Sequence, residues 1–152
     1  MADVTENSPQ DIVNRYRGMV ETLSKYLRWF KENENKAVDQ NYSGSNMDTT
    51  IQFPVYDSTV LSFVKDAQAT GLMDRNYVYL YSRKNLKTWK DELEYIANAD
   101  IMQLDDVNRI LSKYVLGGQV KASMWSEAVQ RGIFEHTVRR MQEVIDLWDH
   151  ER

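Results

Sequence analysis

Apolar side chains recur every three or four residues near both ends of the chain, a spacing that places them on one face of an α-helix. The first series predicts a helix over about residues 9–32. Its members are Ile12, Tyr16, Met19, Leu23, Leu27 and Phe30. The second series consists of Phe134, Val138, Met141, Ile145 and Trp148. Because each helix has a single apolar face, we expect the two to pack antiparallel and so bury both faces.

Four further helices are predicted between these two, from apolar spacing and from residues that commonly cap helix starts. They begin near Ser58, Thr88, Asp100 and Ser123. Glycines follow three of them, at positions where helices commonly end. The pattern therefore favours a chain that is helical over most of its length.

Residues 76–82 show a different pattern, the two-residue period of a β-strand with two unlike faces. The alternating residues are Tyr77, Val78, Tyr79, Leu80 and Tyr81. The segment 51–56 is expected to be extended too, and it is the candidate partner strand. Since a two-stranded ribbon is marginal by itself, we expect helices to cover one of its sides.

Together these elements predict a mostly α fold, α+β at most: a compact helical domain of about six helices with a small two-stranded β-ribbon. A length of 152 residues favours one domain spanning residues 1–152. Residues 1–7 are expected to form a flexible tail. The polar stretch 33–50 is expected to be a mobile loop, because so long a connection lacks apolar periodicity.

Composition narrows the functional classes. The chain has no cysteine, which excludes disulfides, thiolate metal sites and cysteine nucleophiles. No apolar run approaches the roughly 20 residues that cross a bilayer, and the first ten residues lack the apolar core of a signal peptide. We therefore expect a cytoplasmic protein without a membrane partner.

The chain contains no recognisable catalytic or metal-binding motif. Neither of its two histidines, His136 and His150, has a second ligand at the spacing that metal sites use on a helix. The carboxylates near Asp91 and Asp105 fall in the first turns of predicted helices, where they offset the positive end of the helix. The prediction is therefore no catalytic residue, no metal site and no cofactor.

Residues 75–90 form the most basic part of an otherwise acidic chain. The net charge is −4, yet this segment holds five cationic side chains and no acidic one. The predicted binding surface, called the 77–90 surface below, consists of Tyr77, Tyr79, Tyr81, Arg83, Lys84, Lys87, Trp89 and Lys90. Aromatic rings beside cations suit a protein partner or single-stranded nucleic acid. The alternative is that the rings pack inside and the cations lie on an ordinary solvated face.

A glycine-rich turn is the second candidate site, here for an anion or another small ligand. The residues of this 117–125 turn are Gly117, Gly118, Gln119, Lys121, Ser123 and Trp125. Free backbone N–H groups at a helix start, together with a lysine, can hold an anion. A genuine phosphate loop would follow a strand, however, so a plain helix–helix corner stays open as the alternative.

Short motifs are spread over roughly residues 51–145. They are Ala99-Asp100-Ile101 followed by Leu104, Leu111-Ser112-Lys113-Tyr114-Val115, Gly132-Ile133-Phe134 and Val138-Arg139-Arg140-Met141, with Phe53-Pro54, Tyr56, Phe63 and Gly71-Leu72 upstream. On these residues the chain resembles an uncharacterised bacterial family, domain-of-unknown-function family 6508. The resemblance implies a binding or regulatory role in bacteria or their mobile elements, and it implies no catalytic residue.

Three functions are compatible with these features. The first, which we predict, is a non-catalytic protein-interaction or regulatory module that binds an unidentified protein or a second copy of itself. The second is nucleic-acid binding through the 77–90 surface. The third is an enzyme with an unrecognised site, which would need a pocket near Lys121, Trp125 and Glu127.

Overall fold

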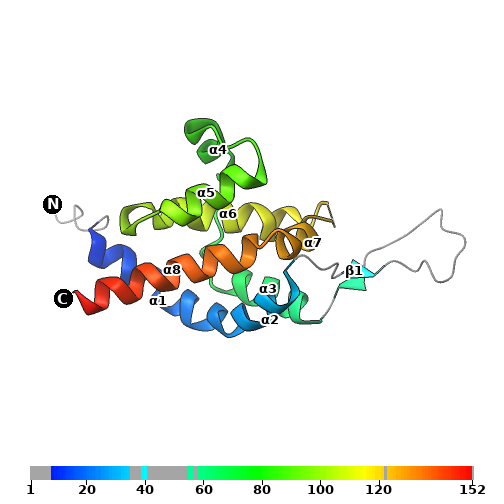
Figure 1. The fold of residues 1–152 in the computed structure, drawn as a ribbon, viewed down its shortest axis with the longest axis horizontal. Helices are drawn as coiled ribbons and strands as arrows, with labels where there is room; N and C mark the ends of the chain where they lie inside the picture. Colours follow the sequence, from blue (N-terminus) through cyan, green and yellow to red (C-terminus); the bar gives the residue numbers. More distant parts are fainter. Residues whose placement is uncertain (1–7, 35–38, 41–54, 57, 122, 152) are drawn as a thin grey trace, which may run out of the picture.

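The computed structural model describes residues 8–34, 39–40, 55–56, 58–121 and 123–151, which form an all-helical domain apart from one minimal pair of strands (Figure 1). In chain order the helices are α1 (Pro9–Leu23), α2 (Leu27–Asn33), α3 (Ser58–Ala69), α4 (Val78–Lys84), α5 (Trp89–Asn98), α6 (Leu104–Gly117), α7 (Ser123–Gln130) and α8 (Ile133–His150). Short 3₁₀ turns precede α2 (Ser24–Tyr26) and α6 (Ile101–Gln103). Within the described part, no helix is long and apolar enough to span a membrane.

The helix starts follow the capping residues of the sequence. The Ser8 hydroxyl accepts a hydrogen bond from the Asp11 amide at 3.2 Å, and Pro9 occupies the first helical position. Thr88 and Asp91 form the reciprocal capping box at the start of α5. The predicted 9–32 helix is interrupted by a single 3₁₀ turn, so it becomes α1 and α2.

The predicted pairing of the terminal helices is confirmed. Figure 1 shows the start of α1 and the end of α8 at the same end of the molecule, so the two helices run antiparallel. The Trp148 indole donates to the Gln10 side chain at 3.1 Å, and Arg17 pairs with Asp149 at 2.8 Å. Helix α8 also contacts α2, α5, α6 and α7, which makes it the central helix of the domain.

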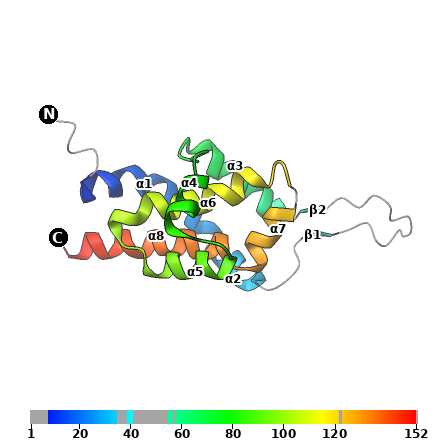
Figure 2. The ribbon, with the colours of Figure 1, turned by 90° about the horizontal axis from the view of Figure 1, so that it is seen from above.

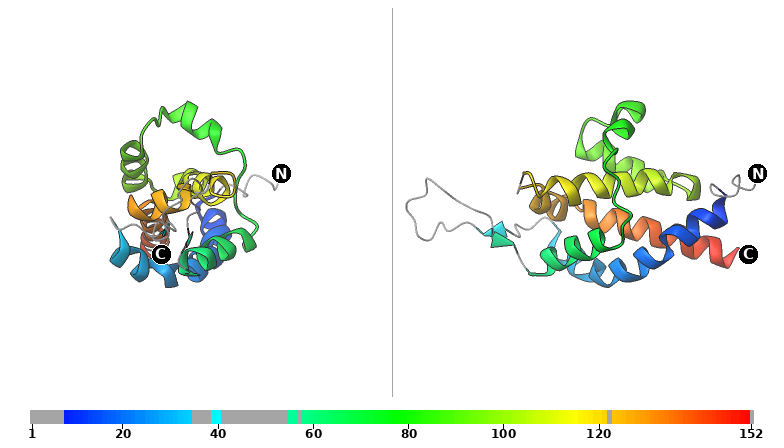
Figure 3. Two further views of the ribbon diagram at one scale, coloured as in Figure 1. Left: turned by 90° about the vertical axis from the view of Figure 1, so that its right-hand side faces the viewer. Right: turned by 180° about the vertical axis from the view of Figure 1, so that it is seen from behind.

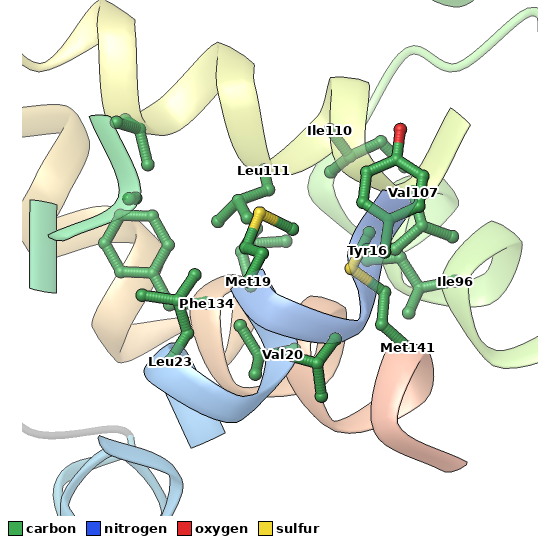
Figure 4. Close-up of a cluster of buried hydrophobic side chains, with 14 of the residues drawn as sticks. Tyr16, Met19, Val20, Leu23, Ile96, Val107, Ile110, Leu111, Phe134 and Met141 are labelled. Atoms are coloured by element: carbon green, nitrogen blue, oxygen red, sulfur yellow. The ribbon is translucent and has the colours of Figure 1, made fainter. Parts of the chain in front are cut away.

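The core lies between α8 and the helices that surround it. Figure 4 shows side chains from α1, α5, α6 and α8 meeting there, among them Met19, Leu111 and Phe134. At the α2–α3 end, the rings of Phe30 and Phe63 are 4.7 Å apart, and Phe63 lies 4.7 Å from Phe134. Burial of these faces is the main force that assembles the helices.

The predicted strand over residues 76–82 is wrong, because residues 78–84 form helix α4. A run of five alternating residues is too short to distinguish a strand from a helix, and a strand needs a neighbour with free backbone groups. In the described part of the segment 51–56, Val55–Tyr56 (β2) pairs antiparallel with Asp39–Gln40 (β1) instead. Asn85, in the left-handed conformation with φ 58°, then ends α4.

Helix α4 projects from the rest of the domain, as Figures 1 and 3 show. Its inner contact is Leu80, which is fully buried, whereas Val78 and Tyr79 are 58% and 67% exposed.

Figure 2 places α7 at the end of the domain remote from the start of α1. The predicted tail 1–7, the segment 51–54 and most of the predicted loop 33–50 lie outside the described residues.

Replacing Phe63 by alanine should lower the free energy of unfolding by about 3–5 kcal/mol, because it removes a fully buried ring and leaves a cavity. Urea unfolding followed by circular dichroism measures the loss. The matched control is Leu61→Ala in the same helix, where the side chain is 46% exposed and the expected change is below about 0.5 kcal/mol. Equal losses in the two variants would contradict this description of the core.

Candidate ligand-binding cavity

A cavity of about 430 Å³ lies among α4, α5, α6 and α7. Its charged lining comprises four cationic side chains, Lys87, Lys113, Lys121 and Arg131, and two acidic ones, Glu92 and Glu127. Its aromatic lining comprises Tyr81, Trp89 and Tyr114. The lining thus carries two more positive than negative charges, in a chain whose net charge is −4.

The floor of the cavity is built on a buried carboxylate. Glu92 is 1% exposed and accepts hydrogen bonds from the hydroxyls of Tyr81 and Tyr114, both at 2.6 Å, and from the Lys113 ammonium at 2.9 Å. Burying a carboxylate carries a large desolvation penalty unless the group is paired with a cation and hydrogen-bonded. These three donors therefore fix α4, α5 and α6 relative to one another.

Lys113 faces the buried carboxylate and the cavity at once. Its ammonium lies 4.4 Å from the ring centre of Tyr81 and 5.0 Å from that of Tyr114. The side chain is 30% exposed and also lines the cavity. Two aromatic faces and one carboxylate hold the cation in place, so its position is set before any ligand arrives.

Both tyrosines of the floor are held in the protonated form. Burial raises the pKa of Tyr81 and of Tyr114 far above the ordinary value near 10, and the negative charge of Glu92 raises each further. A protonated phenol donates its proton in a hydrogen bond, as Glu92 requires. The two hydroxyls are therefore structural donors that support the floor.

Helix α4 is anchored by a second buried carboxylate. Asp106 is 8% exposed and accepts hydrogen bonds from Arg83 at 3.1 Å, Arg109 at 2.7 Å and Tyr95 at 2.6 Å. Arg83 belongs to α4, and Asp106 to α6. Helix α4 therefore reaches two separate buried acids, one through Tyr81 and one through Arg83.

One wall of the cavity is formed by Trp89 and Arg131. The Arg131 guanidinium lies 5.5 Å from the centre of the Trp89 ring, and Glu127 is 3.6 Å from the same guanidinium. Lys87 and Lys121 complete the lining from the two loops at its edge. A flat aromatic surface thus lies beside three cationic side chains, of which Arg131 is already paired with Glu127.

The 77–90 surface does not form the single aromatic face that was predicted. In a helix Tyr77 and Tyr81 lie on one side and Tyr79 on the other, so the three rings diverge. Of the eight residues predicted, the cavity takes Tyr81, Lys87 and Trp89. Arg83 is engaged with Asp106 instead. Tyr79, Lys84 and Lys90 are exposed, and Tyr77 is partly buried.

The 117–125 turn contributes Lys121 to the cavity, and the amides of residues 118–121 are engaged within the turn itself. The amides of Gly118 and Lys121 donate to the carbonyls of Tyr114 and Gly117, at 3.1 and 2.8 Å. The amides of Gln119 and Val120 are engaged in the same way. The anion site predicted at the helix start, where Ser123 begins α7, stays a prediction.

Trp125 has a structural role in the same turn. Its indole donates to the Val115 carbonyl at 3.0 Å and occupies the space where a side chain on Gly118 would begin, 2.0 Å from that Cβ position. A Cβ atom on Gly117 would likewise meet the Met124 side chain, at 2.6 Å from its sulfur. Ser123 is the first residue of α7. Gln119 lines a different cavity, with Arg75.

Sequence reasoning missed Glu92, Lys113, Tyr114 and Arg131 as parts of this site. The sequence pattern places the carboxylates near Asp91, Glu92 among them, in a first turn where they offset the positive end of the helix. One signal was present: Glu92 and Ile96 are four residues apart, so an acidic residue shares the inward face of a helix. Glu127 and Lys121, named for a hypothetical enzyme pocket, do lie at this cavity.

The chain matches no family model, no curated protein and no solved structure.

Replacing Glu92 by glutamine should lower the free energy of unfolding by about 2–3 kcal/mol, because the Lys113 ammonium loses its partner and the tyrosines lose a charged acceptor. Chemical denaturation measures the effect. Glu94→Gln is the control, since Glu94 lies on the exposed face of the same helix. If the two variants are equally stable, the carboxylate does not hold the floor together.

Alkaline pH should destabilise the protein through its tyrosines. Burial and a hydrogen bond to Asp66 raise the pKa of Tyr26 to about 12, and burial raises the pKa of Tyr16, Tyr81, Tyr95 and Tyr114 further. Because these folded-state values exceed the unfolded value near 10, the associated stability is complete below about pH 10 and is lost as pH rises through the folded values.

Phenolate absorbance and circular dichroism, recorded together during titration, measure this effect. Ionisation of these five tyrosines is expected to coincide with the loss of helix. Titration of all nine tyrosines near pH 10 with the helices intact would contradict it.

Proposed function

We propose that this chain is a non-catalytic binding module that holds a small ligand bearing a phosphate group and a flat ring, a nucleotide in chemical class, in the cavity among α4, α5, α6 and α7. One observation carries the proposal. Four cationic side chains from four different parts of the chain converge on one cavity that has an indole wall, although the chain as a whole is acidic.

The size and lining of the cavity support a small ligand. Ligand pockets commonly enclose about 300–1,000 Å³, and this one encloses about 430 Å³. Arg131, Lys87 and Lys121 suit phosphate oxygens, which accept charge-assisted hydrogen bonds from guanidinium and ammonium groups. The Trp89 ring suits a planar heterocycle, because stacking on an indole needs only a flat face.

The floor supports binding rather than chemistry. Glu92 already accepts three hydrogen bonds, and the two tyrosines that donate to it keep their protons at neutral pH. A general base needs a free lone pair aimed at the substrate. The floor groups are committed to one another, which is why we propose a module that binds and senses its ligand.

A protein partner is the second candidate, and the outer side of α4 favours it. Val78 and Tyr79 are more than half exposed on a helix that projects from the domain. Exposed tyrosine side chains are typical of contact surfaces. Neither Val78 nor Tyr79 lines the cavity, so the two candidates can be tested separately.

Calorimetric titration with ADP, pyrophosphate and adenosine tests the proposed ligand class. ADP should bind most tightly, because only ADP engages the cations and the indole together. Lys121→Ala and Arg131→Ala should each weaken ADP binding by about tenfold, the effect of losing one charge-assisted hydrogen bond. Trp89→Leu should weaken adenosine more than pyrophosphate.

Lys84→Ala is the matched control, since Lys84 belongs to the 77–90 surface and lines no part of this cavity. It should leave ADP binding unchanged. No saturable binding of any probe, or equal effects of Lys84→Ala and Lys121→Ala, would contradict the proposal. Tighter binding of a single-stranded oligonucleotide that depends on Lys84 would favour the nucleic-acid alternative instead.

A further inference from the structure

Three potential metal ligands meet where the end of α2 approaches the start of α8. One ligand atom each from Glu34, Glu135 and His136 lies within 4.8 Å of the other two. Glu34 follows the last residue of α2, whereas Glu135 and His136 lie in the first turn of α8. The cluster is separate from the cavity described above and takes no part in the proposed function.

Glu34 brings an unsatisfied oxygen to this cluster. Its Oε1 atom is buried and has no hydrogen-bond partner among the residues that the structure describes. Buried polar atoms in native proteins almost always have a partner, and an unpaired carboxylate oxygen carries the full free-energy penalty of desolvation. A bound cation would remove that penalty, so the orphan oxygen itself points to a ligand.

Glu135 presents a fixed carboxylate. It is 2% exposed, and the Arg139 guanidinium holds its Oε2 atom. Its Oε1 atom lies 3.2 Å from Nδ1 of His136. One oxygen is therefore anchored by a neighbouring cation while the other faces the cluster.

The imidazole of His136 has the contact that metal-bound histidines commonly show. Its Nδ1 lies 2.7 Å from the Gly132 carbonyl, one turn earlier in the chain. This contact fixes the orientation of the imidazole beside Glu135, and the ring nitrogen that carries no proton offers the lone pair that a metal takes. The side chain is 37% exposed, which leaves solvent access to the ring.

Gly132 leaves the space in which these groups approach one another. It has φ +78°, a conformation that favours glycine, and it precedes α8. A Cβ atom there would lie 2.9 Å from Nδ1 of His136 and 3.1 Å from Oε2 of Glu34. Any side chain at position 132 would therefore crowd both groups.

We propose that Glu34, Glu135 and His136 form a binding site for a divalent transition-metal ion of the Zn²⁺ type. One imidazole nitrogen with two carboxylate oxygens suits zinc and its neighbours, whereas Ca²⁺ and Mg²⁺ prefer oxygen ligands alone. Three protein ligands leave coordination positions for water. Because the ion joins α2 to α8, it stabilises the folded state in proportion to its concentration and affinity.

The test is titration of the metal-free full chain with ZnCl₂, followed by calorimetry and by thermal unfolding. We expect one ion per chain with a micromolar or tighter dissociation constant, and a rise in melting temperature. His136→Asn and Glu34→Gln should each weaken Zn²⁺ binding at least about tenfold. Cobalt(II) provides a second readout, because its visible spectrum reports nitrogen ligation and should change in His136→Asn.

Two variants are matched controls. The Nδ1 atom of His150 contacts the Asp146 carbonyl at 2.7 Å, the same local geometry as in His136, but His150 is outside the cluster. Glu32 is exposed and lies one half-turn before Glu34. His150→Asn and Glu32→Gln should leave the Zn²⁺ affinity unchanged.

The proposal is overturned if Zn²⁺ fails to bind at micromolar concentration or if Ca²⁺ binds as tightly. It is also overturned if the control variants weaken binding as much as the cluster variants do. Circular dichroism of the metal-free variants establishes that each is folded. Should His136→Asn fail to fold, Glu34→Gln and the cobalt spectrum of the unsubstituted protein decide the outcome.

Discussion

The position of α4 depends on a carboxylate that has been removed from water. Glu92 is almost completely buried, and the donors that compensate it come from α4 and α6, while Glu92 itself belongs to α5. Apolar burial alone would hold α4 weakly, since Leu80 is its single fully buried residue. Directional hydrogen bonds to Glu92, with those from Arg83 to Asp106, fix where this projecting helix lies.

The cavity follows from this arrangement. A helix held at a distance by polar contacts leaves space beneath it that apolar packing would have closed. The same contacts orient the lining, because Lys113 is held between Glu92 and two aromatic rings. A cation that is already in position loses less conformational entropy when an anionic ligand binds, which favours the site as a binding site.

The junction between α7 and α8 brings the two proposed sites close together along the chain. Arg131 lines the cavity, and the next residue, Gly132, leaves room for Glu34 and His136. An ion held at the cluster would restrain the first turn of α8 and therefore the backbone next to Arg131. The physical link between the sites is this shared turn.

The sequence by itself determined the helices whose signals are local. The period of three and four in α1, α6 and α8 and the capping residues Ser8 and Thr88 act within one or two turns, so they can be read without a partner. Local signals gave the wrong prediction for segment 76–82, because alternating residues in so short a run fit a strand or a helix. In the structure residues 78–84 form helix α4, so the fold and not the local pattern decided for the helix.

The sites were decided by the tertiary structure. Lys121 and Trp89 were found from composition, but Arg131, Lys113 and Glu92 became parts of one cavity only when four helices met. Glu34 and His136 are far apart in the chain, and no spacing rule joins them. Local periodicity reports which face of a helix is buried, whereas the partners of a buried charge depend on contacts between distant segments, which no short stretch of sequence contains.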